Sequence, residues 1–408
     1  MIEKAKSILS AFASQIPKSV FGPEKVTYIA ENIDKIDSDE KIALLNLTNY
    51  ILSKMLEMQA SDIEIGGHAL NGYIWLRIFG DKKPIPELPQ MTTEEACILI
   101  LSLLNKNQIK HLLVSRNLDF SYSFTYEKEK KDVRFRADTY YDLDTLGMNM
   151  RSISASTRPV ESLGFHPFAL KSMSHSFIKF GLSLVTGITG SGKSTTLDSI
   201  IDFHNNTDNA HIVIVAAPIE YVHKSKQCLI RHREVGRDVM SFKEGVIQAL
   251  RQDPDIIVIG EMRDPDTILA ALEVTDTGHK VFSTLHTSSA VESIDRIIAE
   301  VNPVEQERVR NRLADVLISV VSQKLVPSID GKRALAKEVL IVTPSVKAAI
   351  KNDNTSEIYM MINQGAPQGM ITLEQDLLRL FRERRISREN AVAYANNKNR
   401  IIQLMKAL

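Results

Sequence analysis

The alternation of apolar and polar positions indicates that the chain begins with helices and continues as a mixed α/β region. Residues 1–57 have a mostly helical pattern, because apolar side chains recur there every three or four positions. The clearest stripe consists of Leu44, Leu47, Ile51 and Met55. We expect this stripe to pack against the residues that follow it.

Residues 58–157 combine strand and helix patterns. Aliphatic side chains at 74, 76 and 78 alternate with Trp75, Arg77 and Phe79, which predicts a half-buried strand. After a proline-rich loop, residues 92–115 have the pattern of one helix. Further strands are predicted at 119–126, 132–140 and 148–154. We therefore expect a mixed α/β domain in this part of the chain.

Residues 158–330 alternate short apolar runs with helical segments, the pattern of a parallel sheet flanked by helices. The candidate strands are 181–186, 211–216, 255–260 and 280–284. Residues 331–408 are polar and rich in helical patterns. The predicted fold class is α/β, with four segments: a helical N-terminal extension (1–57), an α/β domain (58–157), an α/β core (158–330) and a helical C-terminal region (331–408).

A glycine-rich segment follows the first strand of the predicted core. Residues 187–194 read Gly-Ile-Thr-Gly-Ser-Gly-Lys-Ser, a complete G-x-x-x-x-G-K-[ST] loop between a strand pattern and a helix pattern. In such a loop the backbone amides surround an anion, the lysine reaches the β- and γ-phosphates, and the last hydroxyl binds Mg²⁺. The sequence therefore predicts a nucleoside triphosphate site. Its residues are Gly187, Thr189, Gly190, Ser191, Gly192, Lys193, Ser194 and Thr195, with Ser194 as the metal ligand.

Two more polar side chains follow strands of the same core. Glu261 comes directly after the apolar run 255–260, and His286 follows the run that begins at Lys280. Because the carboxyl ends of parallel strands meet at one edge of a sheet, we expect both side chains near the phosphates. There Glu261 would orient the attacking water or a water on Mg²⁺, and the imidazole of His286 would sense the γ-phosphate.

Composition narrows the classes of protein. The 50 basic and 50 acidic side chains give no net charge, so we expect no nucleic-acid partner. Two cysteines, Cys97 and Cys228, exclude a four-cysteine zinc site and indicate a reducing compartment. No stretch reaches the roughly 18 to 20 apolar residues of a membrane span, and the first residues lack a signal-peptide pattern. We expect a cytoplasmic protein without a transmembrane segment.

These motifs together resemble the secretion ATPase superfamily of type II secretion, type IV pili and type IV secretion, over about residues 58–390. Besides the phosphate loop, the resemblance rests on segments 60–63, 218–223, 233–236, 249–255, 260–264 and 283–287. Within the superfamily the chain is most similar to the pilus retraction ATPase branch. Segments 224–230, 346–351 and 368–373 carry that similarity. The missing zinc-binding cysteines argue against the assembly and secretion branch.

The resemblance implies a PAS-like first domain and a RecA-like P-loop core, assembled as a homo-hexameric ring that binds ATP and Mg²⁺ between the two domains. Arginines of the first domain then reach the phosphates, and the matching positions are Arg134, Arg136 and Arg151. The implied activity is ATP hydrolysis that powers pilus retraction and twitching-type motility. The implied partner is an inner-membrane pilus platform protein, with the motor peripheral at that membrane.

One segment departs from the family pattern. Where the family has Glu-Asp-Pro-Ile-Glu, residues 216–220 read Ala-Ala-Pro-Ile-Glu, so only Glu220 remains of the acids that help hold Mg²⁺ and its water. The departure leaves the hydrolysis rate open, although ATP binding should be unaffected. Two alternatives therefore stand beside the retraction motor: a type IV secretion ATPase, and a hydrolysis-poor ATP-binding subunit that tunes a paralogous motor ATPase. Glu64 is a second departure, at a position where the family usually has histidine.

Overall fold

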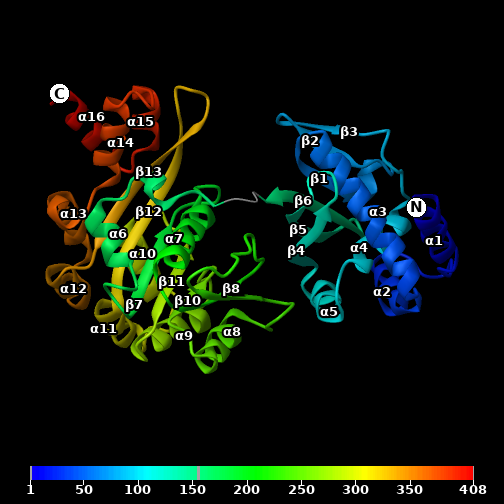
Figure 1. Ribbon diagram of the computed structural model, residues 1–408, viewed down its shortest axis with the longest axis horizontal. Coiled ribbons are helices and arrows are strands. Elements are labelled where there is room, and N and C mark those ends of the chain that lie inside the picture. The colour runs from blue at the N-terminus through cyan, green and yellow to red at the C-terminus, as the bar shows by residue number, and fades with distance from the viewer. Residues whose placement is uncertain (1, 154–156, 408) are drawn as a thin grey trace. The chain divides into compact units, whose positions relative to one another are not determined.

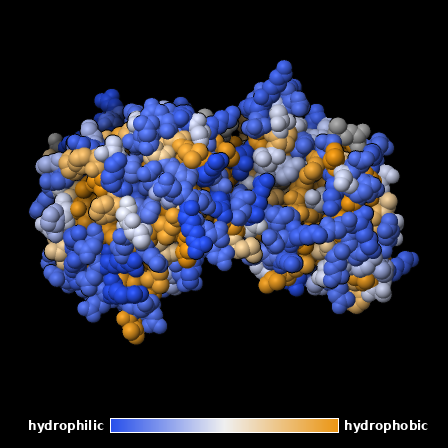
Figure 2. All heavy atoms as spheres, turned by 60° about the horizontal axis from the view of Figure 1, so that its bottom comes forward, coloured by the Kyte–Doolittle hydropathy of each residue, from blue (hydrophilic) through white to orange (hydrophobic). Residues whose placement is uncertain are grey.

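The computed structural model describes residues 2–153 and 157–407, which form two compact units. The N-terminal unit comprises Met1–Ala155 with the short segments Ala217–Tyr221 and Gly236–Asp238. The C-terminal unit holds Ser156–Ala216, Val222–Val235 and Val239–Leu408. Figure 1 shows the elements of each unit. On the face shown in Figure 2, hydrophilic residues cover most of each unit and hydrophobic residues form scattered patches, because each unit buries its own core.

The N-terminal unit is built on a six-stranded antiparallel sheet in the order β3-β2-β1-β6-β5-β4. Its strands are β1 (Ala60–Gly66), β2 (Trp75–Ile78), β3 (Asp81–Pro84), β4 (Asn117–Tyr126), β5 (Lys131–Asp142) and β6 (Thr145–Ile153). Its helices are α1 (Ile2–Ser14), α2 (Pro23–Asn32), α3 (Ser38–Glu57), α4 (Thr93–Ser102) and α5 (Lys106–Ser115). The strand expected at 148–154 ends at Ile153, since residue 154 lies outside the described residues.

The first three helices share one hydrophobic core with the sheet. Leu44 and Met55 of α3 are buried in the same cluster as Ile63 of β1 and Met150 of β6. The apolar stripe of residues 1–57 therefore packs as expected. The prediction of one helix over 92–115 is wrong, because the helix ends at Ser102 and the Asn105 side chain caps a new one by accepting the Gln108 amide.

The C-terminal unit is built on a seven-stranded sheet in the order β13-β12-β7-β11-β10-β8-β9. Neighbouring strands are parallel except β13, which pairs antiparallel with β12. The strands are β7 (Gly181–Thr186), β8 (His211–Ala216), β9 (Leu229–Glu234), β10 (Ile256–Ile259), β11 (Lys280–Leu285), β12 (Leu317–Pro327) and β13 (Arg333–Ile341). The helices are α6 (Pro167–Met173), α7 (Lys193–Thr207), α8 (Phe242–Ala249), α9 (Pro265–Asp276), α10 (Ala290–Ala299), α11 (Gln306–Val316), α12 (Pro344–Lys351), α13 (Ile358–Gln364), α14 (Leu373–Arg382), α15 (Arg388–Tyr394) and α16 (Lys398–Lys406).

The strand order decides which loops become neighbours. Every residue of β7, β10 and β11 is buried, as in parallel strands that are covered on both faces. Because β11 lies between β7 and β10, and β8 follows β10, their carboxyl ends form one row. The phosphate loop, His286, Glu261 and the end of β8 therefore share one edge of the sheet.

Two expectations about the second half of the chain need correction. Residues 331–408 are not wholly helical, because β13 extends the sheet at its start and pairs with β12 along nine residue pairs. Strands β9 and β12 were also not expected. Among the described residues, no helix combines the length and apolar character that crossing a membrane requires.

Candidate nucleotide-binding site

The glycine-rich loop joins the buried strand β7 to helix α7 through a backbone that suits glycine. Gly190 and Gly192 have φ angles of 79° and 88°, a region that favours glycine. At Gly187, with φ of 150°, a Cβ atom would collide with the Ser191 side chain and the Gln323 carbonyl oxygen. The three glycines therefore let the loop turn tightly and bring its amides together.

The N-terminus of α7 supplies groups that fit a phosphate. Its N-cap residue is Gly192, and no side chain of the described residues caps the first turn. Those amides remain for an anion, which the helix dipole also favours. Ser194 and Thr195 are exposed, and the buried Ser191 hydroxyl has no hydrogen-bond partner within the described part of the chain. These amides and hydroxyls suit a nucleotide phosphate with its Mg²⁺ ion.

The Lys193 ammonium folds back over the loop. Its Nζ atom donates to the carbonyl oxygens of Gly187 at 2.8 Å and Ile188 at 3.3 Å. This places the positive charge above the same backbone that would hold a phosphate. A cation there can neutralise the charge of β- and γ-phosphate oxygens.

Glu261 and His286 come together at the same edge. His286 Nε2 lies 3.4 Å from one carboxylate oxygen of Glu261, and Arg263 Nε lies 2.6 Å from the other. The Glu261 side chain is only 12% exposed, whereas that of His286 is 38% exposed. Burial lowers the pKa of His286, and the positive charge of Lys193 lowers it further, which favours a neutral imidazole beside the phosphate loop.

The end of β8 contributes no carboxylate to this edge. Ala216 is the last residue of the strand, and the neighbouring Gly260 amide donates to the Val215 carbonyl oxygen at 2.8 Å. A Cβ atom on Gly260 would lie 3.0 Å from the Ala216 Cβ atom, so the glycine makes room for this close approach. Glu220, the remaining acid of this segment, belongs to the N-terminal unit and lies 3.6 Å from Arg136.

The three candidate arginines lie on β5 and β6 of the N-terminal unit. Arg136 pairs in register with Arg151, and Arg134 is two residues from Arg136, so one face of the sheet carries all three. Arg136 lies 3.2 Å from Asp119, Arg151 lies 2.7 Å from Asp62, and Arg134 donates to the Ile219 carbonyl oxygen at 2.8 Å. Their role toward a phosphate stays a prediction.

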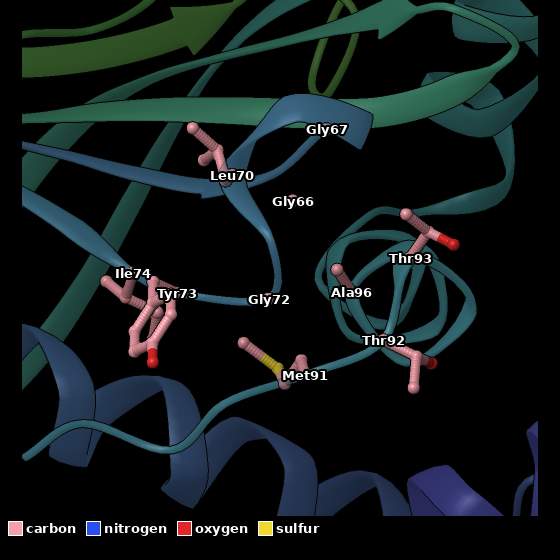
Figure 3. Close-up of a pocket in the computed structure, with 10 residues that line it drawn as sticks. All are labelled: Gly66, Gly67, Leu70, Gly72, Tyr73, Ile74, Met91, Thr92, Thr93 and Ala96. Carbon is pink, nitrogen blue, oxygen red and sulfur yellow. The ribbon is translucent and has the colours of Figure 1, made fainter. Parts of the chain in front are cut away.

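Two other features of the N-terminal unit do not form a nucleotide site. Glu64 lies 2.6 Å from Lys82 and accepts a hydrogen bond from Asn149 at 3.0 Å, so it is part of the sheet's own ion pairing. Figure 3 shows a cavity beside Gly66 and α4, of about 10 Å³. Such a volume holds at most a single water molecule.

Sequence motifs missed the residues that support the loop from outside it. Gln323 on β12 donates from Nε2 to the Ser191 carbonyl oxygen at 2.8 Å. Thr284 on β11 donates to the Gly260 carbonyl oxygen at 2.6 Å and so fixes the residue before Glu261. No local pattern marks Gln323, because its role depends on the pairing of β12 with β7.

A glycine-rich loop between a buried parallel strand and a helix, with a carboxylate at the end of a neighbouring strand, defines a P-loop nucleotide-binding protein. Comparison with known proteins narrows this class. The family described as "Type II/IV secretion system protein" matches residues 37–401, and the chain belongs to this family.

Several relatives cover most of the chain. The "Type IV pilus retractation ATPase PilT" of Pseudomonas aeruginosa is 40% identical over 316 residues, which cover 78% of this chain and 89% of that protein. A "Twitching motility protein" of Neisseria gonorrhoeae is 38% identical over 323 residues, covering 79% of this chain and 84% of that protein. A crystal structure of "the Pilus Retraction Motor PilT and Bound ADP" matches with a TM-score of 0.75 and 34% identity, covering 87% of this chain and 98% of that one. The expected fold, an α/β N-terminal domain followed by a RecA-like P-loop core, is confirmed.

Proposed function

We propose that this chain is the ATPase motor that drives retraction of type IV pili. The observation that carries the proposal is the cluster of Lys193, Glu261 and His286 at one edge of the parallel sheet. This cluster occurs in a chain that matches 89% of a pilus retraction ATPase at 40% identity. Pilus retraction is therefore the function that both the site and the relatives support best.

Each group of the cluster has a separate part in the proposed hydrolysis. Lys193 and the loop amides bind the phosphates, and the exposed Ser194 hydroxyl is the proposed Mg²⁺ ligand. Glu261 orients or activates the attacking water, while His286 contacts the γ-phosphate. We also propose that Glu220 assists and that Arg134, Arg136 and Arg151 add positive charge around the phosphates of the assembled motor.

The proposed assembly follows from the same relationship. We infer a homo-hexamer that works in the cytoplasm, peripheral at the inner membrane, against a pilus platform protein. ATP hydrolysis would drive a conformational cycle in each subunit, which is how lids and domains convert chemistry into motion.

The proposal is tested by one biochemical and one cellular measurement. Purified full-length chain should hydrolyse ATP only with Mg²⁺, and its native mass should correspond to six subunits. In the host bacterium, deletion of the gene should stop pilus retraction, which the unchanged gene should restore. A Lys193→Ala gene that restores retraction equally well would overturn the proposed motor role, provided that both proteins accumulate to the same level.

A second candidate function is favoured by Ala216 and Ala217. A subunit that binds ATP tightly but hydrolyses it slowly could tune an active paralogous motor, and the missing acids fit that behaviour. Tight ATP binding by the purified chain, combined with turnover near background, would favour this candidate over the autonomous motor.

A further inference from the structure

A buried carboxyl group lies behind the candidate site, on the strand that the sequence patterns did not reveal. Glu338 is on β13, and 3% of its surface is exposed. Its partner in the sheet is Ser322 of β12. A buried carboxyl group costs free energy unless it is hydrogen-bonded, so its contacts indicate what it does.

The Glu338 carboxyl group binds the start of helix α10. One of its oxygens accepts a hydrogen bond from the Ala290 amide at 2.8 Å, and Ala290 is the first residue of α10. First-turn amides have no partner inside their own helix, and helix dipoles favour a negative charge at this end. Glu338 therefore holds the start of α10 to β13.

Helix α10 in turn holds the loop that carries His286. An Arg296 guanidinium nitrogen donates to the His286 carbonyl oxygen at 3.2 Å. Ser293 shares a hydrogen bond of 2.7 Å with Thr287, the residue after His286. The same Ser293 hydroxyl lies 3.4 Å from Thr186 Oγ1, at the end of β7 just before the phosphate loop. A shift of α10 would therefore move both His286 and the end of β7.

A second contact ties this loop to the C-terminal helices. Asn396 donates from Nδ2 to the Ser288 carbonyl oxygen at 3.1 Å, and Lys324 donates to Asn396 Oδ1 at 2.6 Å. The segment between β11 and α10 is thus fixed from β12, from β13 and from the chain after α15. This makes its position dependent on groups that lie outside the phosphate-binding motif.

We propose that Glu338 is a positioning residue for ATP hydrolysis: by fixing the start of α10 against β13, it holds His286 in the place from which the imidazole reaches the γ-phosphate. The proposal rests on the proposed ATPase function and extends it to a residue that has no contact with the motif. It adds β13 to the structure that sets the catalytic geometry.

The position of Glu338 gives the proposed role a pH dependence. The pKa of Glu338 is raised to about 7. Burial is the largest cause and the negative charge of Glu374 on α14 adds to it, while the hydrogen bond from the Ala290 amide and the charge of Lys324 on β12 oppose the rise. Glu292 of α10 is the other acid near Lys324. The ionised carboxylate is a stronger acceptor for the Ala290 amide than the protonated group is. Hydrolysis should therefore increase as the pH rises through about 7.

The test compares Glu338→Gln with Glu374→Gln in the full chain. Glutamine keeps the volume of Glu338 but removes the negative charge that strengthens the hydrogen bond from the Ala290 amide. Glu374 is also buried, at 1% exposure, but its carboxylate accepts from the Asn397 amide and the Tyr359 hydroxyl, and within the described part of the chain no hydrogen bond joins it to α10. It is therefore a matched control for the loss of a buried negative charge.

We expect Glu338→Gln to lower kcat roughly 10- to 100-fold, with a KM for ATP changed less than about threefold, as for a displaced catalytic group. Its rate should no longer rise near neutral pH. Glu374→Gln should keep the wild-type kcat at high pH, and the midpoint of its pH profile should move to lower pH, because a negative charge near Glu338 is gone. Melting temperatures of both variants check that each is folded.

The outcomes separate this proposal from the proposed function. If the wild-type chain hydrolyses ATP in a Lys193-dependent manner but Glu338→Gln has an unchanged kcat and pH profile, the positioning role is wrong and the ATPase stands. If the wild-type chain does not hydrolyse ATP, the ratio of its affinity for ATP to its affinity for ADP is measured in place of kcat. This ratio reports the proposed contact of His286 with the γ-phosphate. An unchanged ratio in Glu338→Gln overturns the role. If Glu338→Gln does not fold, an unmoved midpoint in Glu374→Gln overturns it.

Discussion

The two ends of the seven-stranded sheet both carry paired titratable side chains, yet they differ in what those side chains face. At the amino ends of the strands, Lys280 and His204 are almost completely buried, with exposures of 0% and 1%. At the carboxyl ends, His286 is 38% exposed and Ser194 lies open to solvent. Only the second set can meet a ligand.

The amino-end groups bond to other groups of the protein. Lys280, the first residue of β11, donates to the Ile178 carbonyl oxygen at 3.0 Å, and burial lowers its pKa to about 7. His204 lies 2.6 Å from Asp208, and burial lowers the pKa of His204. These contacts join the chain segments that precede β7, β8 and β11. We interpret this cluster as structural.

The difference shows that a shifted pKa does not by itself identify a functional site. Desolvation perturbs both His204 and His286, and it is the first cause in each case. The carboxyl end adds two features that the amino end lacks among the described residues: a helix N-terminus without a side-chain cap, and hydroxyls exposed beside it. Those features, and not the pKa shifts, point to a phosphate ligand.

The strongest test of this distinction removes the Lys193 ammonium. Lys193→Ala should reduce ATP hydrolysis by at least roughly 100-fold, since the charge that faces the phosphates is lost in a preorganised site. The melting temperature without nucleotide should stay close to that of the wild type, because the Lys193 Nζ atom donates to the Gly187 and Ile188 carbonyl oxygens of its own loop. Steady-state phosphate release and thermal unfolding are the measurements. Undiminished turnover would show that the carboxyl end is not the site of hydrolysis.

Removing the charge of Glu261 should have the next largest effect. Glu261→Gln should lower kcat by roughly 100-fold, the range of a general acid or base, while the affinity for ATP changes little. The control is Asp266→Asn, a carboxylate of the following helix whose side chain is 66% exposed. If Glu261→Gln turns over like Asp266→Asn, water activation belongs to another residue of this edge.

Restoring the missing acids should have a moderate effect in the opposite direction. Ala216→Glu combined with Ala217→Asp should raise kcat several-fold, up to roughly 10-fold, because carboxylates near the phosphates can orient Mg²⁺ and its waters. Ala216→Gln with Ala217→Asn matches the size without the charge. An equal rate in both double variants would mean that Glu261 suffices and that the alanines do not limit turnover.

At the carboxyl ends of the strands, the sequence predicted the chemical groups better than it predicted the residues that position them. The phosphate loop, Glu261 and His286 were found because each directly follows a strand whose apolar run is continuous in the sequence. Gln323 and Glu338 were missed, because their contacts depend on how β12 and β13 pair with distant strands. The prediction of a single helix over residues 92–115 was wrong although the sequence there contains the relevant pattern. Asn105 and Gln108 form a capping box, which marks the start of a second helix.

The smallest expected effect on turnover comes from a substitution at the amino ends of the strands. It tests whether the groups there stabilise the fold without taking part in hydrolysis. Lys280→Met should leave ATP hydrolysis within about twofold of the wild type, because the buried Lys280 ammonium donates to the Ile178 carbonyl oxygen at the amino ends of the strands, away from the phosphate loop. Its effect should fall on stability. The folded-state pKa is about 7 and the ordinary value is 10.5, so the wild type loses stability as the pH falls from about 10 to about 7.

The methionine variant has no such proton to bind, and its melting temperature should depend less on pH in that window. We therefore expect the wild type to gain stability relative to Lys280→Met between about pH 7 and about pH 9, as measured by thermal unfolding at each pH. A parallel pH dependence in the two proteins would mean that Lys280 is not buried as an uncharged amine. A large loss of turnover in a stably folded Lys280→Met would mean that the amino end takes part in the reaction, and the contrast between the two ends of the sheet would then be wrong.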